Sequence, residues 1–353
     1  MGSVTDSLGI AVIGAGYWGP NLARNLHASA DWRLDVICDL DPDRAAALAA
    51  RFGGARPETD VGAVLADPRI DAVAIATPAR THASLACAAL EAGKHVLVEK
   101  PLADSGAHAE SMIEAAAANR LVLMADHTYC YTPAVLKIRE LIAEGALGDI
   151  LFLDSVRINL GLIQPDVDVF WDLAPHDLSV IDFVLPDGLR PESVSAIGAD
   201  PLGAGRACLG YLTLPLGGGA VAHVHVNWLS PTKVRQMIIG GTRRTLVWDD
   251  LNPQQRLSVY DRGVDLELQT LDGVERAEAT VSYRLGDTWS PALPEREAIA
   301  VMVGEFAASI REGRAARTDG AAGVRVLRVL EAATASAADG GAPVAVRIPE
   351  PVS

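Results

Sequence analysis

Residues 8–19 read LGIAVIGAGYWG, and this stretch decides how the first part of the chain folds. An apolar run ends in the motif G-x-G-x-x-G at Gly14, Gly16 and Gly19, and apolar residues then recur at helical spacing. The order of strand, glycine turn and helix is the context in which this motif binds dinucleotides. Gly14 allows a tight turn, Gly16 lets the backbone approach a pyrophosphate, and Gly19 lets the helix pack closely on the strand.

A second feature predicts which dinucleotide binds. Another apolar strand, residues 33–39, ends at Asp39, twenty residues after Gly19. A carboxylate at that place accepts hydrogen bonds from the ribose hydroxyls of adenosine and repels a 2′-phosphate, so it selects NAD over NADP. The alternative is that Asp39 only caps a helix that begins near Pro42.

The composition narrows the classes of partner. The chain has 353 residues, half of them apolar, and a net charge of −15 without runs of Lys or Arg. Such a surface repels nucleic acid and anionic membranes, so we expect neither as a partner. We find no apolar stretch near the roughly 20 residues that span a bilayer, and no signal-peptide pattern at the start. Four widely spaced cysteines fit reduced thiols in a cytoplasmic protein.

Up to residue 125, predicted strands and helices alternate, which indicates a doubly wound parallel sheet, an α/β Rossmann domain over residues 1–125. The predicted strands are 8–14, 33–39, 71–76, 95–99 and 121–125. The predicted helices are 18–28, 42–51, 60–66, 81–92 and 104–119.

From residue 126 the pattern changes to extended segments, which favours an α+β domain with a largely antiparallel sheet over residues 126–353. We expect this domain to bind substrate, and one face of its sheet must be covered, either by its own helices or by another subunit. The acidic, apolar-rich composition favours a homo-oligomer. The triplet Gly217-Gly218-Gly219 predicts a hairpin. The predicted strands are 149–159, 192–199, 206–215, 219–229, 233–240, 244–248 and 343–348. The predicted helices are 133–143, 173–185, 294–312 and 321–337, of which the last two could pack back on the first domain.

Polar residues follow two strands of the first domain. Thr77 and Pro78 end one strand, His82 begins the next helix, and Glu99 and Lys100 end the following strand. Ligands of open α/β sheets lie beyond the carboxyl ends of the strands, so these residues should border the cofactor. Lys100 could also be an ordinary solvent-facing loop residue, although the following proline stiffens that loop.

The chain resembles the Gfo/Idh/MocA oxidoreductases, the glucose–fructose oxidoreductase and inositol dehydrogenase family. The resemblance rests on GAGYWG at 14–19, TPARTH at 77–82, EAGKHVLVEKPL at 91–102 and WDLAPHD at 171–177, with weaker matches at 228–231 and 239–242. The wording of 171–177 is similar to a branch of nucleotide-sugar and antibiotic-sugar dehydrogenases, a sugar 3-dehydrogenase-like branch. The cofactor residues implied by the motifs and the resemblance are Gly14, Gly16, Tyr17, Trp18, Gly19, Asp39, Thr77, Pro78, His82, Glu99 and Lys100.

The resemblance also implies catalytic residues. It places Lys100 at the nicotinamide, where it hydrogen-bonds the reacting hydroxyl, and it pairs Asp172 with His176. The spacing of four puts both side chains on one helical face, where Asp172 could fix the tautomer of His176 and favour its protonated form. An ordinary histidine titrates near pH 6.5, so His176 could accept a hydroxyl proton. Without the resemblance, a helix-start histidine satisfied by Asp172 or Asp177 is the simpler interpretation.

Four more residues lie where the family lines its substrate pocket: His127, Tyr131, Arg157 and Asn159. Arg157 could bind a phosphate or sugar carboxylate, or be an exposed strand residue. Asp166 and Asp168 make one loop acidic, which could favour an amino sugar or simply be solvated. His223 and His225 share a strand face, but no third ligand accompanies them, so we expect no metal.

We therefore expect an NAD-dependent dehydrogenase that oxidises a secondary hydroxyl, most plausibly at C3, of a pyranose in a nucleotide sugar or aminoglycoside-type sugar. Its ketosugar product would feed amino-sugar or antibiotic-sugar biosynthesis through an aminotransferase. Alternatives are an inositol dehydrogenase, a ketosugar reductase, and a non-catalytic NAD-sensing or scaffold protein.

Overall fold

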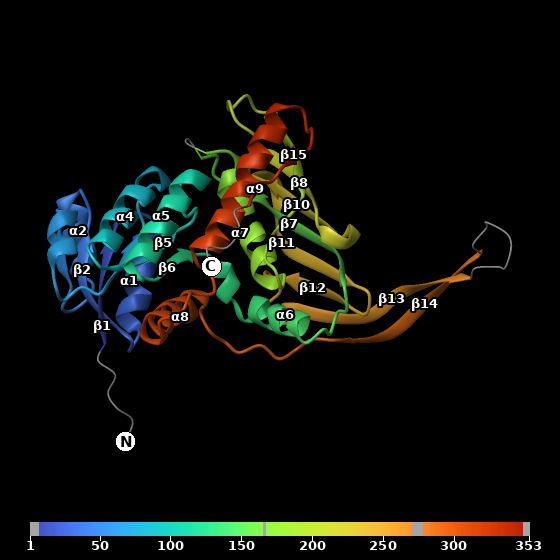
Figure 1. Ribbon diagram of the computed structural model, residues 1–353, viewed down its shortest axis with the longest axis horizontal. Helices are drawn as coiled ribbons and strands as arrows, with labels where there is room; N and C mark the ends of the chain where they lie inside the picture. The colour runs from blue at the N-terminus through green and yellow to red at the C-terminus, as the bar shows by residue number, and fades with distance from the viewer. Residues whose placement is uncertain (1–6, 165–166, 270–277, 349–353) are drawn as a thin grey trace, which may run out of the picture.

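The computed structural model describes residues 7–164, 167–269 and 278–348. These residues build two sheets that lie side by side, each with its own helices (Figure 1). The predicted fold class is confirmed, because a parallel sheet is followed by a mixed, mostly antiparallel one.

The first sheet has six parallel strands in the order β3-β2-β1-β4-β5-β6. Its strands are β1 (Leu8–Ile13), β2 (Trp32–Cys38), β3 (Arg56–Glu58), β4 (Ala72–Ile75), β5 (His95–Glu99) and β6 (Leu123–Asp126). Its helices are α1 (Gly19–Ala28), α2 (Pro42–Ala49), α3 (Val61–Ala66), α4 (His82–Glu91) and α5 (Gly106–Asn119). α1 and α2 pack on one face, and α3, α4 and α5 pack on the other. The strand order reverses at β1, where such sheets bind ligands.

The second sheet has nine strands in the order β14-β13-β12-β11-β7-β10-β9-β8-β15. Its strands are β7 (Ile150–Leu160), β8 (Ser193–Ala199), β9 (Leu209–Pro215), β10 (Val221–Asn227), β11 (Leu229–Gly241), β12 (Thr245–Asp249), β13 (Leu257–Gln269), β14 (Glu278–Trp289) and β15 (Val344–Ala345). Only β7 and β10 pair in parallel, and β9 and β10 form the hairpin predicted from the glycine triplet.

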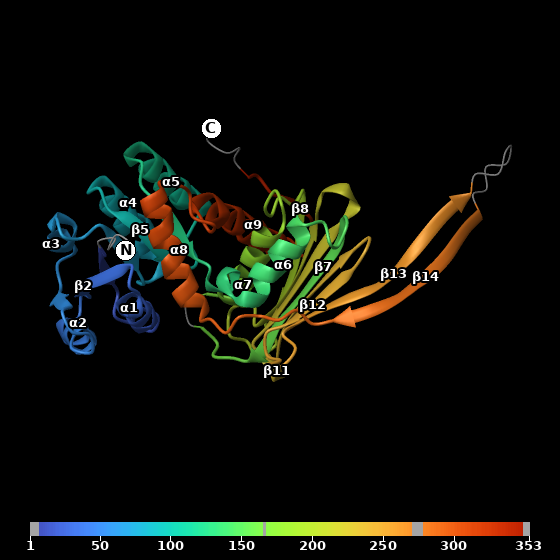
Figure 2. The same ribbon diagram turned by 90° about the horizontal axis from the view of Figure 1, so that it is seen from below.

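The helices of the second part are α6 (Pro133–Ala143), α7 (Val169–Val184), α8 (Ala298–Glu312) and α9 (Gly320–Ala338). The sheet contacts α7 and α9 on one face only, as Figure 2 shows. α7 begins four residues before the predicted start, because Asp168 caps it by accepting hydrogen bonds from the N–H groups of Phe170 and Trp171.

Three strands, β3, β13 and β14, were not predicted from the sequence. β13 and β14 pair with each other and project from the body as an arm (Figures 1 and 2). Because little of the arm packs on the rest of the chain, no continuous apolar run marks it in the sequence.

The two C-terminal helices return to the first sheet. α8 packs on α1. Beside this contact Trp32, the first residue of β2, stacks on Phe306 of α8, and the indole N–H of Trp32 donates to the carbonyl of Val303 at 2.8 Å. α9 lies against α5, α7 and β8, so it contacts both halves of the molecule.

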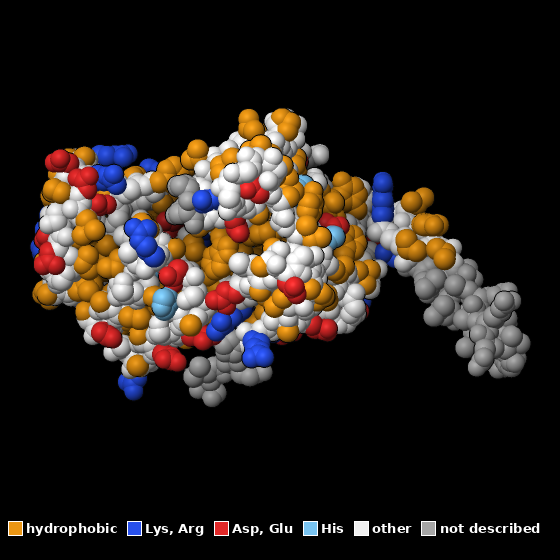
Figure 3. Space-filling model, turned by 90° about the horizontal axis from the view of Figure 1, so that it is seen from above, with side chains coloured by type: hydrophobic (Ala, Val, Ile, Leu, Met, Phe, Trp, Pro, Cys, Tyr) orange, Lys and Arg blue, Asp and Glu red, His pale blue; other side chains and the backbone are white. Residues whose placement is uncertain are grey.

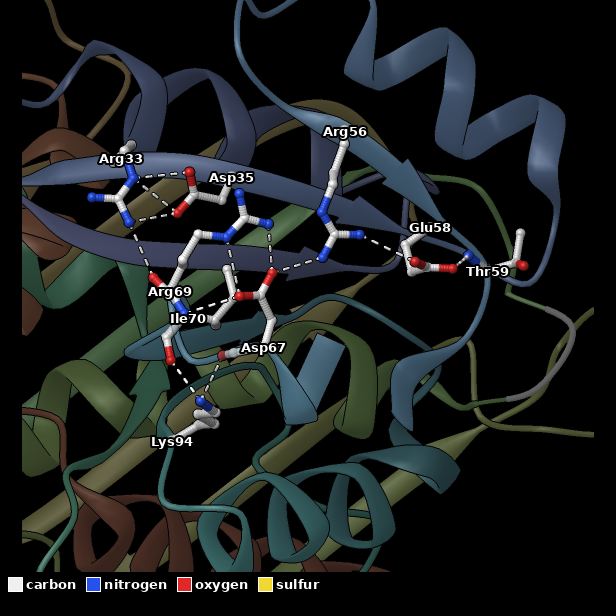
Figure 4. A network of polar contacts seen from close by, with 9 residues as sticks. All are labelled: Arg33, Asp35, Arg56, Glu58, Thr59, Asp67, Arg69, Ile70 and Lys94. Atoms are coloured by element: carbon white, nitrogen blue, oxygen red, sulfur yellow. Dashed lines mark hydrogen bonds and ion pairs between the residues drawn. The ribbon is translucent and has the colours of Figure 1, made fainter. Parts of the chain in front are cut away.

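A polar network closes the amino-terminal edge of the first sheet (Figure 4). The Asp67 carboxylate accepts hydrogen bonds from Arg56 and Arg69, which hold its pKa far below the ordinary value. Lys94 is buried and donates to the carbonyls of Asp67 and Ile70. This edge is therefore structural, and the opposite edge, at the carboxyl ends of the strands, carries the cavity described next.

Candidate active site

A cavity of about 560 Å³ opens at the carboxyl edge of the first sheet. The glycine loop after β1 forms one wall, and the residues that follow β2, β3 and β4, together with Glu99 at the end of β5, form the others. The predicted cofactor residues that line it are Gly14, Gly16, Tyr17, Trp18, Asp39, Thr77, Pro78 and Glu99.

The glycines fit the tasks predicted for them. Gly14 has a φ of +105°, and a side chain there would lie 2.5 Å from the carbonyl oxygen of Ala76. A side chain at Gly19 would collide with the carbonyl of Gly14, so α1 packs directly on the turn. At Gly16 a side chain would meet nothing, which leaves open backbone on the cavity wall for a phosphate.

Asp39 supports the glycine loop and faces the cavity. Its carboxylate accepts hydrogen bonds from the N–H of Ala15 at 2.7 Å and of Asp41 at 2.9 Å. Asp41, not Asp39, caps α2. The alternative interpretation of Asp39 as that helix cap is therefore wrong.

His82 does not line the cavity. Its buried ring bonds the carbonyl oxygens of Thr77 at 2.7 Å and Pro101 at 2.9 Å, and burial lowers its pKa. It ties the loop after β4 to the loop after β5, so it supports two walls of the cavity from behind.

Two acidic residues lie where the cavity meets the second half of the molecule. Burial, and then the charge of Asp126, raises the pKa of Glu99 to about 7. Asp126 accepts a hydrogen bond from the indole N–H of Trp18 at 2.6 Å, and burial raises its pKa as well. Both carboxyl groups therefore hold protons more readily than ordinary side chains do.

Lys100 follows Glu99 and reaches α7. Its ammonium donates to the carbonyl of Asp172 at 3.2 Å and lies 3.8 Å from the carboxylate. The indole N–H of Trp228 donates to the same carboxylate at 2.9 Å. Three distant segments of the chain therefore meet at Asp172.

His176 lies one turn after Asp172, but among the described residues nothing hydrogen-bonds its ring. Burial, followed by the charges of Lys100 and Arg157, holds the pKa of His176 well below its ordinary value. The ring is therefore uncharged near neutral pH, because burial and these cations outweigh any preference for the protonated form that Asp172 provides. No described residue hydrogen-bonds its nitrogens, and the role of His176 as a base stays a prediction.

Arg157 is not an exposed strand residue. Its guanidinium is buried and donates to both oxygens of Asp177, at 2.8 and 3.1 Å, and Ser155 donates to one of them. It also lies 4.4 Å from the ring centre of Tyr129. The alternative of an exposed residue is therefore wrong, whereas substrate binding stays a prediction, because Asp177 takes up two of the five N–H groups of Arg157.

The other predicted pocket residues differ in placement. His127 is buried and neither ring nitrogen has a partner among the described residues; burial, then Lys100, lowers its pKa to about 4. Asn159 is half-buried near Trp228. Tyr131 lies in the core, where its hydroxyl bonds Thr318, so it does not join the group.

Sequence reasoning missed several members of the group. They are Asp126, Tyr129, Asp177, Trp228 and Arg235. Tyr129 stands between His127 and Tyr131 in the sequence, and Asp177 belongs to the quoted WDLAPHD, so both had a signal. Arg235 had none, because only the pairing of β11 with β7 places it opposite Arg157.

The remaining candidates lie elsewhere. Asp168 caps α7, and Asp166 falls outside the described residues. His223 bonds Thr213 at 2.8 Å and His225 stacks on Tyr211, both on the second sheet. Within the described ranges no cluster of His, Cys, Asp or Glu could hold a metal ion. The described helices include none that is long and apolar enough to cross a membrane.

The fold, the glycine loop and Asp39 together define an NAD-dependent oxidoreductase. A family model described as an oxidoreductase family with an NAD-binding Rossmann fold matches residues 8–127, and one described as the GFO/IDH/MocA C-terminal domain matches residues 135–247. The chain belongs to the GFO/IDH/MocA family, which confirms the resemblance seen in the sequence.

Named relatives act on sugars and polyols. The UDP-N-acetylglucosamine 3-dehydrogenase of Acidithiobacillus ferrooxidans is 31% identical over 90% of this chain and 93% of its own length. Its structure aligns with a TM-score of 0.78 over 94% of this chain and 98% of that one. GenD2 from gentamicin A biosynthesis, solved with NAD, aligns with a TM-score of 0.79 and 26% identity over 98% of both chains. Levoglucosan dehydrogenase of Pseudarthrobacter phenanthrenivorans is 31% identical over 57% of this chain and 60% of its own length, so that match spans about three fifths of the relative.

Proposed function

We propose that the protein oxidises a secondary hydroxyl of a pyranose, at C3, in a nucleotide sugar or an aminoglycoside-type sugar. The observation that carries this proposal is that Lys100, next to Glu99 of the cofactor cavity, donates to Asp172, one helical turn before His176. The named activity of the Acidithiobacillus relative supports oxidation at C3, and the pathway named for GenD2 supports an antibiotic sugar.

In this proposal His176 removes the hydroxyl proton. NAD, held by the glycine loop and Asp39, would supply the acceptor for the hydride of the same carbon, and a ketone would remain. His176 suits the task because its ring is uncharged and free of protein partners. Lys100 holds the hydroxyl oxygen by a hydrogen bond and favours negative charge on it as the proton leaves. Asp172 keeps the Lys100 ammonium in place, and Trp228 keeps Asp172 in place.

His127 and Asn159 bind the sugar ring in this proposal. A buried imidazole without partners is costly unless a ligand supplies them, and His127 has one donor and one acceptor to offer. Because its pKa is about 4, it stays uncharged near neutral pH and suits neutral hydroxyl groups.

The decisive experiment is a substrate screen with NAD, followed by NADH absorbance. The panel contains UDP-N-acetylglucosamine, an aminoglycoside such as paromamine, levoglucosan and myo-inositol. The proposal expects turnover with the first or second, and product analysis should place the ketone at C3. Oxidation of inositol alone would make the protein an inositol dehydrogenase. NAD binding without turnover of any compound would favour a non-catalytic protein.

The product and the cysteines suggest the setting. A 3-ketosugar is the substrate type of an aminotransferase, so we place such an enzyme after this step. The four cysteines are unpaired in the structure, three of them buried, which fits a reducing cytoplasm.

We also propose that the protein is a homo-oligomer. The face of the second sheet opposite α7 and α9 carries exposed Ile197 and Tyr211. On the arm, Arg262 pairs with Leu285 and Val264 with Tyr283, so these side chains share one face. Leu285 is 85% and Tyr283 is 73% exposed, and Figure 3 shows hydrophobic side chains gathered where the arm leaves the body.

A second copy is the occupant that this surface fits. Nine strands about 4.8 Å apart and roughly 20 Å long give a face of about 800 Å², which is what each partner contributes to a standard interface. The double change Y283E/L285E should lower the mass measured by light scattering, whereas L202E, at an exposed loop leucine, should not. A monomeric parent protein would disprove this part of the proposal.

A further inference from the structure

Beneath the His176 ring lies a buried ion pair that takes no part in binding or proton transfer as described above. Arg157, on β7, and Asp177, on α7, are each about 3% exposed and bind through two hydrogen bonds, with Ser155 as a third member. A buried ion pair costs desolvation, and replacing it with apolar residues is often neutral or stabilising. Stability alone therefore does not explain why Arg157 and Asp177 are buried together.

Tyr129 connects this pair to the base. Its ring lies 4.4 Å from the Arg157 guanidinium carbon and 5.1 Å from the centre of the His176 ring, at an interplanar angle of 66°. A guanidinium over an aromatic face is attractive, and so is an edge-to-face pair of rings. The contacts run in a row, Asp177 to Arg157 to Tyr129 to His176, and both ends of the row belong to α7.

We propose that Arg157 and Tyr129 are positioning residues that hold His176 in its uncharged, substrate-facing state. Asp177 fixes the guanidinium, the guanidinium fixes the Tyr129 ring, and the ring fixes the imidazole, whose nitrogens stay free for the substrate. Tyr129 contacts the imidazole through its ring and not through a hydrogen bond. Both imidazole nitrogens therefore stay available to a substrate while Tyr129 orients the ring. The role of His176 as a base belongs to the proposed function, on which this inference rests.

The charges around His176 agree with this role. Lys100 approaches from the end of β5, Arg157 from β7 and Arg235 from β11, and these three cations disfavour a proton on the ring. His127, at the end of β6, is uncharged near neutral pH. On α7 itself, Asp172 is bound by Trp228 and Asp177 by Arg157, and both carboxylates keep their negative charge. Asp177 therefore offsets part of the positive charge that Arg157 adds near the imidazole.

The chain offers a matched control. Arg139 on α6 lies 4.3 Å from the ring centre of Phe183, so a second guanidinium stacks on an aromatic ring of the same region. Phe183 is seven residues beyond His176 on α7 and belongs to the core. R139M therefore removes a similar contact without touching the row that ends at His176.

The test measures the His176 pKa directly, by NMR titration of labelled histidines, with H176N used to assign the signal. R157M should raise that pKa by about 0.5 to 1 unit, because it removes a positive charge near the imidazole. R157K should leave it unchanged, and so should R139M. An unchanged His176 pKa in folded R157M would overturn the charge role of Arg157. If R157M does not fold, D177N leaves the Arg157 charge without its counter-charge, so the His176 pKa should fall, and an unchanged pKa would overturn the charge role.

Kinetics test the orientation separately. Y129A should lower kcat at least about 10-fold with little change in the KM for NAD, whereas Y129F should recover most of that loss. If Y129A and R139M lose the same factor, the Tyr129 contact is merely structural and the orientation role fails. The NMR readout needs no substrate, so a parent protein that oxidises no sugar would defeat the proposed function and still leave the charge role tested.

Discussion

The cofactor cavity and the group around His176 are built in different ways. One continuous strand, turn and helix supplies the glycine wall of the cavity, and its features are backbone features such as the φ of Gly14 and the open approach at Gly16. The group around His176 is made of side chains from β5, β7, β11, α7 and the end of β6. Local sequence determines the first region, whereas the packing of the two halves determines the second.

The electrostatics of the two regions differ as well. Asp39 is a carboxylate on the wall of the cofactor cavity, where it accepts a hydrogen bond from the glycine loop. Cations surround His176, and they hold its pKa and that of His127 low. At the border, burial raises the pKa of Glu99 and Asp126. Glu99 on the cavity wall, whose pKa is raised to about 7, is therefore an acidic group that changes charge near neutral pH.

The largest expected effect lies in the second region. K100M and H176N should each lower kcat by about 10² to 10⁴, because each removes a group that contacts the reacting hydroxyl. The Kd for NAD, followed by fluorescence, should change little. H223N, at an exposed histidine of β10, serves as the control and should keep full activity. Parent-like rates in both variants would refute the assignment of the site.

The second-largest expected effect comes from a substitution in the glycine loop of the cofactor cavity. G14A should weaken NAD binding by about 10- to 100-fold, since the new side chain must adopt a left-handed backbone 2.5 Å from the carbonyl of Ala76. G53A is the control, because a side chain at Gly53 would meet nothing within 4 Å. Calorimetric titration with NAD measures both. Equal affinities would show that the turn tolerates a side chain and that its glycine is not needed.

These differences explain what could be predicted from sequence. The alternation of strands and helices, the glycine loop and Asp39 are short-range patterns, and the structure places them as expected. The sequence also identified His127 and His176 as candidate site residues. It did not predict the protonation state of His176, because the pKa of that ring depends on its burial and on Arg157 and Arg235, which the pairing of β7 with β11 brings near.

Arg157 and Tyr131 show the same limit. Both are polar residues near the junction of the halves. The sequence does not reveal that Asp177 binds two N–H groups of Arg157, or that Thr318 binds the Tyr131 hydroxyl. Tyr129 shows the converse, since it lies two residues from Tyr131 but on the side that meets His176. In a short helical turn such as Thr128–Tyr131, sequence alone does not fix which tyrosine faces the site.

A smaller effect concerns cofactor choice. D39A should weaken NAD binding about 10-fold through loss of the ribose contacts, and should reduce the preference over NADP. Arg44 lines the same cavity and is held by Asp41 at 3.2 Å, so it could then meet a 2′-phosphate. D43A on the same helix is the control. If the parent protein already prefers NADP, the interpretation of Asp39 is wrong.

The smallest effect tests the border between the regions through Glu99. Its pKa is raised to about 7 in the folded protein, from an ordinary value near 4.5, so its ionisation opposes folding. That contribution to stability is present at pH 4.5 and is lost as the pH rises through 7. E99Q removes it, so the Tm of E99Q and of the parent should agree near pH 5, and E99Q should exceed the parent by about 2–4 °C at pH 8. Histidines that titrate in this range do so in both proteins, so the difference between the two curves isolates Glu99. A constant difference from pH 5 to pH 8 would mean that Glu99 is ionised throughout, and that burial at the border does not control its charge.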